Sequence, residues 1–129
     1  MITISSSCQS PLPTIHCCKH PCFVRNMEDD YLYALKGRHL YLNMIDTYTD
    51  QVYFNAMMVK AKEFYALHGS IHVHCNKGQS RSPSVALILM YGDLPFHEAI
   101  RKFKSFYPAY RPCEGILRCV VQFMAEDSF

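Results

Sequence analysis

A cysteine and an arginine bracket five residues in the segment Cys75–Arg81, and this segment joins two apolar runs of different periodicity. Residues 70–74 alternate between polar and apolar, with β-branched side chains at the apolar positions, as is typical of a strand that enters a core. Residues 85–90 form an apolar run of valine, alanine, leucine, isoleucine and methionine, which is typical of a helix. The order strand, tight loop, helix constrains the fold more than any other feature.

The helix is predicted to begin directly after Arg81. Ser82 is a favourable N-cap, and Pro83 suits the first turn because its missing amide hydrogen would have no intrahelical partner there. Free amides at a helix N-terminus bind anions, and a short loop containing Gly78 can turn its own amides toward the same point. The guanidinium of Arg81 can hold two oxygens of one phosphate. The segment therefore predicts a site for a tetrahedral, dianionic group.

The same surroundings act on Cys75. A thiol at a helix N-terminus beside a guanidinium has its pKa lowered from about 8.5 toward roughly 3.5 to 7.5. A thiolate below a bound phosphate is placed for in-line attack on phosphorus, which predicts phosphoryl transfer through a phosphocysteine. We expect no metal and no other cofactor to be needed. A buried structural cysteine is the alternative interpretation of Cys75.

The loop resembles the signature His-Cys-x-x-Gly-x-x-Arg-Ser/Thr of the cysteine-dependent protein phosphatases, with a match at every fixed position. It most closely resembles the dual-specificity branch and its small bacterial and phage-like members. The resemblance implies that Arg81 binds phosphate in the ground and transition states, and that the Ser82 hydroxyl helps the cysteine to leave. His74 would tune the thiolate through the backbone. The remaining phosphate-binding residues would be those of the loop: Asn76, Lys77, Gly78, Gln79 and Ser80.

Cleavage of a phosphate ester also needs a proton donor for the leaving group and then a base for water. Asp46 ends the strand-like run 39–45 and lies 29 residues before Cys75, which is similar to the spacing in the dual-specificity family. An acid at the end of a strand beside the loop is well placed for this chemistry. Asp50 is the alternative, although its position before a predicted helix suits a cap.

The 129 residues predict one α/β domain spanning residues 1–129, with a small, mostly parallel sheet and helices on both faces. Strands are expected near 39–45 and 70–74. Helices are expected near 51–67, 83–91 and 96–106, and a further one near 114–125. The phosphatase resemblance covers the core, residues 38–125, whereas residues 1–37 match poorly. Cys113 stands where the family has an asparagine after Arg-Pro.

Two features bear on the location of the protein. No apolar run reaches the length of about 18 residues that spans a membrane, and the N-terminus lacks the pattern of a signal peptide. We therefore expect a cytoplasmic protein with no membrane association, whose seven cysteines are mostly reduced. A monomer is the default expectation.

The segment 16–22 gathers further metal-competent side chains: His16, Cys18, His20 and Cys22 beside Cys17. Structural zinc sites usually join two separated ligand pairs, and no second pair is evident, so an ordinary cysteine cluster is the favoured interpretation and zinc the alternative. A third possibility is redox protection, in which Cys113 or an N-terminal cysteine forms a reversible disulfide with Cys75.

The net charge of +2 is too small to indicate binding to nucleic acid. The expected partner is a phosphorylated protein, since a short chain predicts a shallow pocket that accepts phosphotyrosine and phosphoserine or phosphothreonine. Lys77 in the loop leaves open a polyanionic substrate such as a phosphoinositide or an RNA 5′-triphosphate end. A catalytically silent phosphate-binding module is the third hypothesis.

Overall fold

Short segments rich in β-branched and aromatic residues form the sheet at the centre of this computed structural model, which describes residues 1–18, 32–44 and 53–127. The sheet has the order β1-β5-β2-β4-β3, and all neighbouring pairs are parallel except the antiparallel pair of β3 and β4. The predicted class, one α/β domain with a mostly parallel sheet, is confirmed. The five strands are β1 (Ile2–Ser5), β2 (Thr14–His16), β3 (Tyr33–Lys36), β4 (His39–Leu42) and β5 (Ile71–His74).

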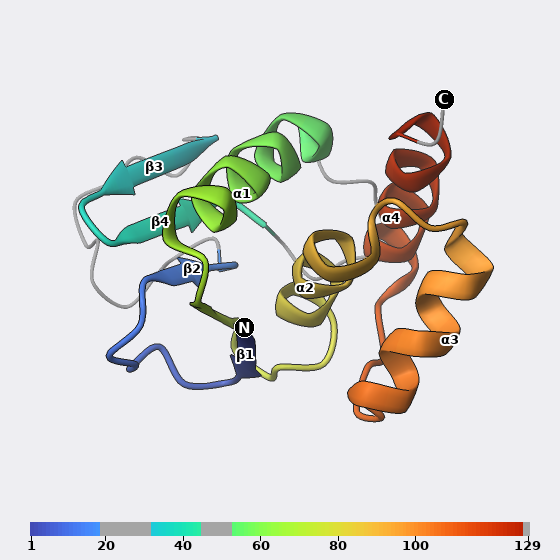
Figure 1. The fold of residues 1–129 in the computed structure, drawn as a ribbon, viewed down its shortest axis with the longest axis horizontal. Coiled ribbons are helices and arrows are strands. Elements are labelled where there is room, and N and C mark those ends of the chain that lie inside the picture. Colours follow the sequence, from blue (N-terminus) through green and yellow to red (C-terminus); the bar gives the residue numbers. More distant parts are fainter. Residues whose placement is uncertain (19–31, 45–52, 128–129) are drawn as a thin grey trace.

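Four helices follow in the second half of the chain: α1 (Phe54–His68), α2 (Arg81–Tyr91), α3 (Phe96–Phe106) and α4 (Glu114–Asp127). Helices α1 and α2 contact the sheet and each other, while α3 and α4 pack against α2. Figure 1 shows them as one group that extends from α1, over β4, to α3. The predicted second helical layer has no member among the described residues.

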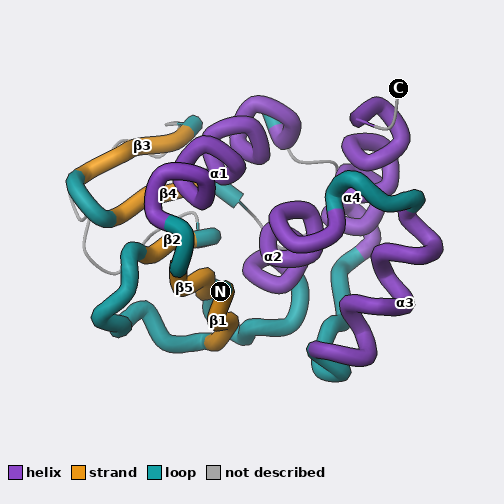
Figure 2. Tube along the Cα trace, viewed as in Figure 1, coloured by secondary structure: helices purple, strands orange, loops and turns teal. Residues whose placement is uncertain are grey.

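Alternation along the two central strands gives the sheet two different faces, because successive side chains point to opposite sides. Ile15 in β2, with Ile71 and Val73 in β5, belongs to the apolar core shared with the helices. The intervening side chains include His16 and His74 and are also buried. Figure 2 shows β1, β5 and β2 lying side by side.

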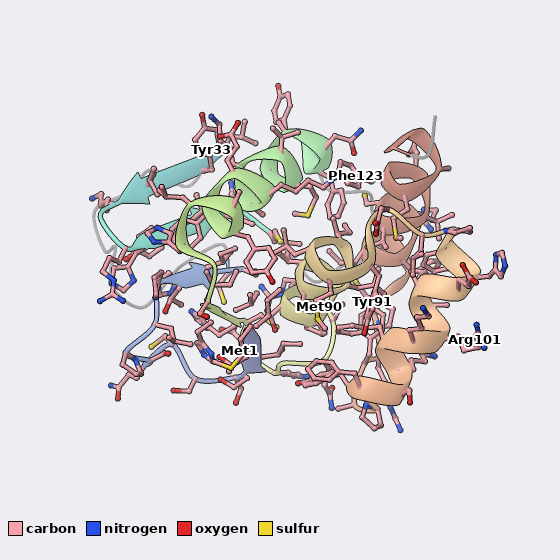
Figure 3. All side chains as sticks on the ribbon, in the orientation of Figure 1. Met1, Tyr33, Met90, Tyr91, Arg101 and Phe123 are labelled. Carbon is pink, nitrogen blue, oxygen red and sulfur yellow. The ribbon has the colours of Figure 1, made fainter. Side chains whose placement is uncertain are left out.

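The helical group has its own apolar contacts. Phe123 of α4 faces α1, and its ring centroid lies 6.3 Å from that of Phe54 (Figure 3). The ammonium group of Lys62 lies 5.1 Å from the same Phe123 ring, where a cation is attracted to the π face. These contacts connect the first and last helices, so both ends of the helical layer support α2 between them.

Three strands lie in the first 37 residues, where the sequence predicts none. Strand β2 occupies an interior position of the sheet, between β5 and β4. Strands β3 and β4 form a hairpin whose turn contains Gly37 with φ +59°, a backbone conformation that favours glycine. The alternation of Ile2–Ser5 and the glycine of this turn are the sequence signals that could have identified these strands.

Several predicted boundaries need correction. Strand β4 ends at Leu42 rather than at residue 45. Helix α1 begins at Phe54 with Tyr53 as its N-cap, whereas Asp50, the predicted cap, lies outside the described residues. Helix α2 begins at Arg81, two residues before the predicted range 83–91, and Ser80 rather than Ser82 is its N-cap. In the described parts of the chain, no helix has the length and apolar character needed to cross a membrane.

Candidate active site

Cys75 directly follows β5, and its side chain is buried at the N-terminal end of α2. The backbone N–H of Gly78 donates to Cys75 Sγ at 3.3 Å. The hydroxyl oxygen of Ser82 lies 3.1 Å from the same sulfur and can donate to a thiolate. Ser82 therefore contacts the sulfur directly, and it lies inside α2 as the second residue of the helix rather than at the cap.

These contacts decide the ionisation of the thiol. Burial raises the pKa of Cys75, because it disfavours the charged form. Hydrogen bonds from the Ser82 side chain and backbone and from the Gly78 N–H act in the opposite direction, as does the positive charge of Arg81. Their sum lowers the pKa of Cys75 below its ordinary value. The direction agrees with the expectation from the sequence.

Arg81 is the first residue of α2, and its side chain is largely buried. Its Nη1 donates to the backbone oxygen of Met44, just beyond the end of β4, at 3.3 Å. Its Nε–H is buried and has no acceptor among the described residues. A buried donor of this kind, beside Cys75 and a helix N-terminus, suits an anionic oxygen.

The loop between Cys75 and Arg81 is shaped by Gly78, which has φ +68°. A Cβ at this position would lie 3.2 Å from the Ser5 carbonyl carbon and 3.3 Å from the Tyr107 hydroxyl. The Tyr107 hydroxyl donates to the carbonyl oxygen of Gly78 at 2.6 Å, while the Gly78 N–H donates to the Cys75 sulfur. Of the other predicted phosphate-binding residues, Ser80 is buried, whereas the side chains of three are exposed: Asn76, Lys77 and Gln79.

The segment after α3 supports the second half of the loop. The backbone N–H of Cys113 donates to Ser80 Oγ at 2.9 Å, and the N–H of Arg111 donates to the carbonyl oxygen of Gln79 at 2.7 Å. Both contacts use the backbone of residues 111 and 113. The loop is therefore supported here by backbone groups, and these two contacts do not depend on an asparagine side chain at position 113.

Ser84 and Tyr110 form a buried network beneath the same part of the loop. Ser84 Oγ donates to the carbonyl oxygen of Ser80 at 2.6 Å and lies 2.7 Å from the Tyr110 hydroxyl. Burial raises the pKa of Tyr110 to about 12, so this hydroxyl stays protonated. Sequence reasoning missed these residues and Tyr107, and their only signal was a pair of tyrosines close to the recognised Arg-Pro.

His74 takes part in a chain of imidazoles on the opposite face of the sheet. Its Nε2 lies 2.6 Å from His16 Nδ1, and His16 Nε2 lies 3.0 Å from His39 Nδ1. Burial lowers the pKa of His74 to about 4, with further contributions from His72 and Arg81. The carbonyl oxygen of His74 also accepts from the Cys17 N–H at 2.9 Å.

Two predicted features lie partly or wholly outside the described residues. Asp46 and its alternative Asp50 belong to residues 45–52, so the identity of the acid stays a prediction. In the segment 16–22, only His16, Cys17 and Cys18 are described. The described residues contain no group of three or more His, Cys, Asp or Glu side chains arranged to hold a metal.

Comparisons with known proteins place the fold. No protein-family model matches the chain. No curated protein matches it in sequence. Among solved structures, it is similar to DUSP15, with a TM-score of 0.65 and 18% identity over 91% of this chain and 72% of DUSP15. It is also similar to PTPMT1, solved in complex with PI(5)P, with a TM-score of 0.63 and 17% identity over 89% of this chain and 77% of PTPMT1. The chain therefore shares the fold of these two proteins, and its chemistry has to be argued from its own residues.

Proposed function

We propose that the chain is a cysteine-dependent phosphatase that hydrolyses phosphomonoesters through a phosphocysteine intermediate. The observation that carries the proposal is the convergence on Cys75 Sγ of the Gly78 N–H and the Ser82 hydroxyl, beside Arg81 at the start of α2. The fold shared with DUSP15 and PTPMT1 supports it. So does the phosphatase signature in residues 74–82.

In the first step, the Cys75 thiolate attacks phosphorus opposite the leaving oxygen. The guanidinium of Arg81 and the N–H groups of residues 76–81 bind the non-bridging oxygens and stabilise their charge in the transition state. Asp46 donates a proton to the departing alkoxide or phenoxide. This step forms a sulfur–phosphorus bond and breaks the phosphorus–oxygen bond of the ester.

In the second step, Asp46 accepts a proton from a water molecule that attacks the phosphocysteine. The sulfur leaves as a thiolate, and the Ser82 hydroxyl, which lies 3.1 Å from Sγ, donates a hydrogen bond to it. The same contacts that lower the pKa of Cys75 therefore make it a better leaving group. Nucleophile, anion site and proton donor all come from the chain, so this mechanism needs no metal.

Asp46 is favoured over Asp50 by the position of the chain just before it. The carbonyl oxygen of Met44 accepts a hydrogen bond from Arg81 Nη1, so the backbone reaches the phosphate site two residues before Asp46. Asp50 also lies outside the described residues, and the N-cap of the described helix α1 is Tyr53. Both aspartates therefore belong in the experimental comparison.

The proposed substrates are phosphotyrosine and phosphoserine or phosphothreonine in proteins of the cytoplasm. A shallow pocket, in which both long and short phosphorylated side chains reach Cys75, is part of this proposal. A phosphoinositide is the second candidate, because Lys77 is exposed within the loop and PTPMT1 was solved with PI(5)P. An exposed cation beside the phosphate site favours substrates that carry a second anionic group.

The first experiment measures hydrolysis of an aryl phosphate by the purified protein in the presence of a chelator, with and without vanadate. We expect turnover that vanadate blocks and that Cys75→Ser abolishes, because serine is not ionised at neutral pH. A trapped phosphoenzyme, detected as an acid-stable mass increase on the peptide containing Cys75, would identify the intermediate. Full activity of Cys75→Ser would exclude the mechanism.

A second experiment assigns the acid and the substrate. Asp46→Ala and Asp50→Ala are compared on aryl phosphates with good and poor leaving groups, since loss of a general acid slows poor leaving groups most. If only Asp50→Ala shows this pattern, the assignment of Asp46 is wrong. A phosphopeptide panel measured beside phosphoinositides and 5′-triphosphorylated RNA then ranks the substrate classes by kcat/KM.

A further inference from the structure

Strand β1 ends beside the loop that follows β5. The two strands pair in parallel and lie side by side (Figure 2), and Ser5, the last residue of β1, is in register with His74. The Ser7 N–H then donates to Ser5 Oγ at 3.0 Å, and this hydroxyl donates to the Ser7 carbonyl oxygen at 3.3 Å. These contacts bend residues 5–7 into what we call the Ser5–Ser7 turn. The turn therefore lies at the edge of the sheet that carries Cys75.

The backbone of the Ser5–Ser7 turn packs closely on Gly78. A Cβ added to Gly78 would lie 3.2 Å from the carbonyl carbon of Ser5 and 3.3 Å from the backbone nitrogen of Ser6. A methyl group would not fit there without movement, so the turn limits the positions that the Gly78 backbone can take. The Gly78 N–H is the group that donates to Cys75 Sγ at 3.3 Å. A displaced turn would therefore let this N–H move away from the sulfur.

The imidazole of His72 holds the turn in place. Its Nε2 lies 2.9 Å from the Ser7 carbonyl oxygen and 3.1 Å from Ser5 Oγ, and its Nδ1 lies 2.6 Å from Thr3 Oγ1. Because a carbonyl oxygen only accepts hydrogen bonds, Nε2 carries the hydrogen that it donates to Ser7. His72 is 6% exposed, so water competes little for these contacts. One buried ring thus joins β5 to three residues of the first chain segment.

Strand β1 has other contacts that keep it in the sheet. It pairs with β5 along its whole length. Ile2 is buried in the apolar core, and Ile4 packs against that core. The Ile71 N–H donates to the Met1 carbonyl oxygen at 3.0 Å. Two of the three contacts of His72 lie at or beyond the end of the strand, so the loss of its imidazole should release the turn more than the strand.

We propose that His72 is a positioning residue of the active site: it fixes the Ser5–Ser7 turn, which then keeps the Gly78 N–H directed at the sulfur of Cys75. This role rests on the proposed phosphatase function, because the direction of the N–H matters for catalysis only if Cys75 is the nucleophile. A hydrogen bond from an N–H favours the charged form of a thiol. His72 therefore acts on the nucleophile through two backbone segments and does not touch the substrate.

The two histidines of β5 have different partners. His74 directly precedes Cys75, and its Nε2 lies 2.6 Å from His16 Nδ1, on the side of β2. The ring of His72 is nearly parallel to that of His74, with centroids 6.4 Å apart, but it bonds to residues of β1 and of the Ser5–Ser7 turn. Since β1 and β2 flank β5 in the sheet, the two imidazoles support opposite sides of the strand that carries the nucleophile.

The test measures the pH dependence of Cys75 alkylation by iodoacetamide in the reduced, full-length protein. His72→Leu removes both ring nitrogens. The midpoint of its alkylation profile should move to higher pH, so that alkylation at pH 6 is roughly threefold slower because less thiolate is present. His72→Gln should keep the midpoint of the wild type, since its side-chain amide can still donate to the Ser7 carbonyl oxygen. Alkylation requires no turnover, so this result stands apart from the test of phosphatase activity.

Thr14→Val is the matched control for a change beside His72. Thr14 is in register with His72 on the β2 side of β5, and its hydroxyl donates to the Leu12 carbonyl oxygen at 2.9 Å. The variant should lose stability but keep the alkylation midpoint. Ser5→Ala perturbs the turn from its other side, because it removes the hydroxyl that contacts both Ser7 and His72. Its midpoint should shift in the same direction as that of His72→Leu.

The kinetic consequence follows from the same shift. The kcat/KM of His72→Leu for an aryl phosphate should fall roughly threefold at pH 6 and return toward that of the wild type at higher pH. An unshifted midpoint in His72→Leu, or an equal shift in His72→Gln or Thr14→Val, would overturn the proposal. If His72→Leu does not fold, an unshifted midpoint in Ser5→Ala overturns it instead. An inactive wild type whose midpoint still shifts in His72→Leu would contradict the phosphatase function but support the positioning of Gly78 by His72.

Discussion

Strands β2 and β5 present different residues to the two sides of the sheet. On the side of the helices, Ile15, Ile71 and Val73 are buried among apolar side chains. On the other side, His16 and His74 are buried in contact with each other, and the ring of His16 stacks on that of Tyr41 with centroids 4.4 Å apart. One face is held by apolar packing, whereas the other is held by rings that can take up protons.

This difference continues into the active-site edge. Cys75 extends the apolar side, and Asn76 extends the histidine side, where it meets Cys18. The sulfur of Cys75 therefore lies on the face that is held by apolar packing. The histidines directly behind it must stay neutral to remain buried, because a buried charge without a partner is costly. The two faces should consequently respond differently to cavities and to acid.

The largest expected effect comes from a cavity on the apolar face. Ile15 is fully buried in β2, and Ile15→Ala should lower the free energy of unfolding by about 2 to 5 kcal/mol, the range for large-to-small core substitutions. The decrease in the free energy of unfolding should be equal at pH 7.5 and pH 5.5. Urea unfolding of the variant and the wild type at both pH values measures it. A loss that grows strongly toward acid would show that the apolar face is coupled to the histidines.

Acid should act on the opposite face. Burial lowers the pKa of His16 to about 3, with His74, His39 and His72 lowering it further. Since the unfolded histidine titrates near 6.5, the unfolded state binds more protons below that pH, and stability is lost as pH falls from about 6.5 toward the folded values of about 3 and 4. For each histidine that stays neutral in the folded state, the free energy of unfolding at pH 5 should be lower by up to about 2 kcal/mol than at neutral pH.

His16→Gln tests which residue carries this dependence, because glutamine can form hydrogen bonds but does not titrate. Between pH 6.5 and pH 5, the free energy of unfolding of this variant should fall less than that of the wild type. The difference between the two losses should equal the contribution of one histidine. His97→Gln is the matched control, since His97 is exposed on α3 and should leave the slope unchanged. An unchanged slope in His16→Gln would remove His16 from the explanation.

The helices and the loop were accessible from the sequence because their signals are local. Helix α3 has the predicted bounds, and β5 differs by one residue, since periodicity and the Cys75–Arg81 spacing are read within a few residues. Strands β1 and β2 were missed because they are three or four residues long and are defined by pairing with the distant β5.

The same limit applies to the candidate site. Cys75, Arg81 and Ser82 were identified from one stretch of sequence, although the contact between Ser82 and the sulfur replaced the predicted cap. Tyr107 and Cys17 reach the loop through contacts with Gly78 and His74, which are far from them in the sequence, and no local pattern indicates such pairs. Asp46 lies outside the described residues and stays a prediction.

The loop at the junction of the two faces should be sensitive to Gly78→Ala. The positive φ costs a non-glycine residue about 1 to 2 kcal/mol, and the new Cβ would also press on Ser5, Ser6 and the Tyr107 hydroxyl. Gly37→Ala is a matched control, because Gly37 has φ +59° but a Cβ added there would have nothing within 4 Å. We expect both variants to lose stability, as thermal unfolding measures, but only Gly78→Ala to lose phosphatase activity, by roughly tenfold or more. Equal activity in the two variants would show that close packing of Gly78 is not needed.

The smallest expected effect comes from one hydroxyl group. Tyr107→Phe removes the donor to the Gly78 carbonyl oxygen and should cost about 1 kcal/mol of stability. Burial raises the pKa of Tyr107, and the charge of Cys75 raises it further, so the hydroxyl is a donor throughout the neutral range. Because this bond helps to orient the residue whose N–H points at the sulfur, the variant should also raise the pKa of Cys75. The pH dependence of iodoacetamide alkylation measures that shift.

Tyr110→Phe is the matched control for this hydroxyl. It loses a contact with Ser84 but none with Gly78, so it should lose stability without shifting the alkylation profile. If both tyrosine variants alkylate like the wild type, the Gly78 N–H keeps its direction without Tyr107, and the geometry around the sulfur is set by β5 and α2 alone.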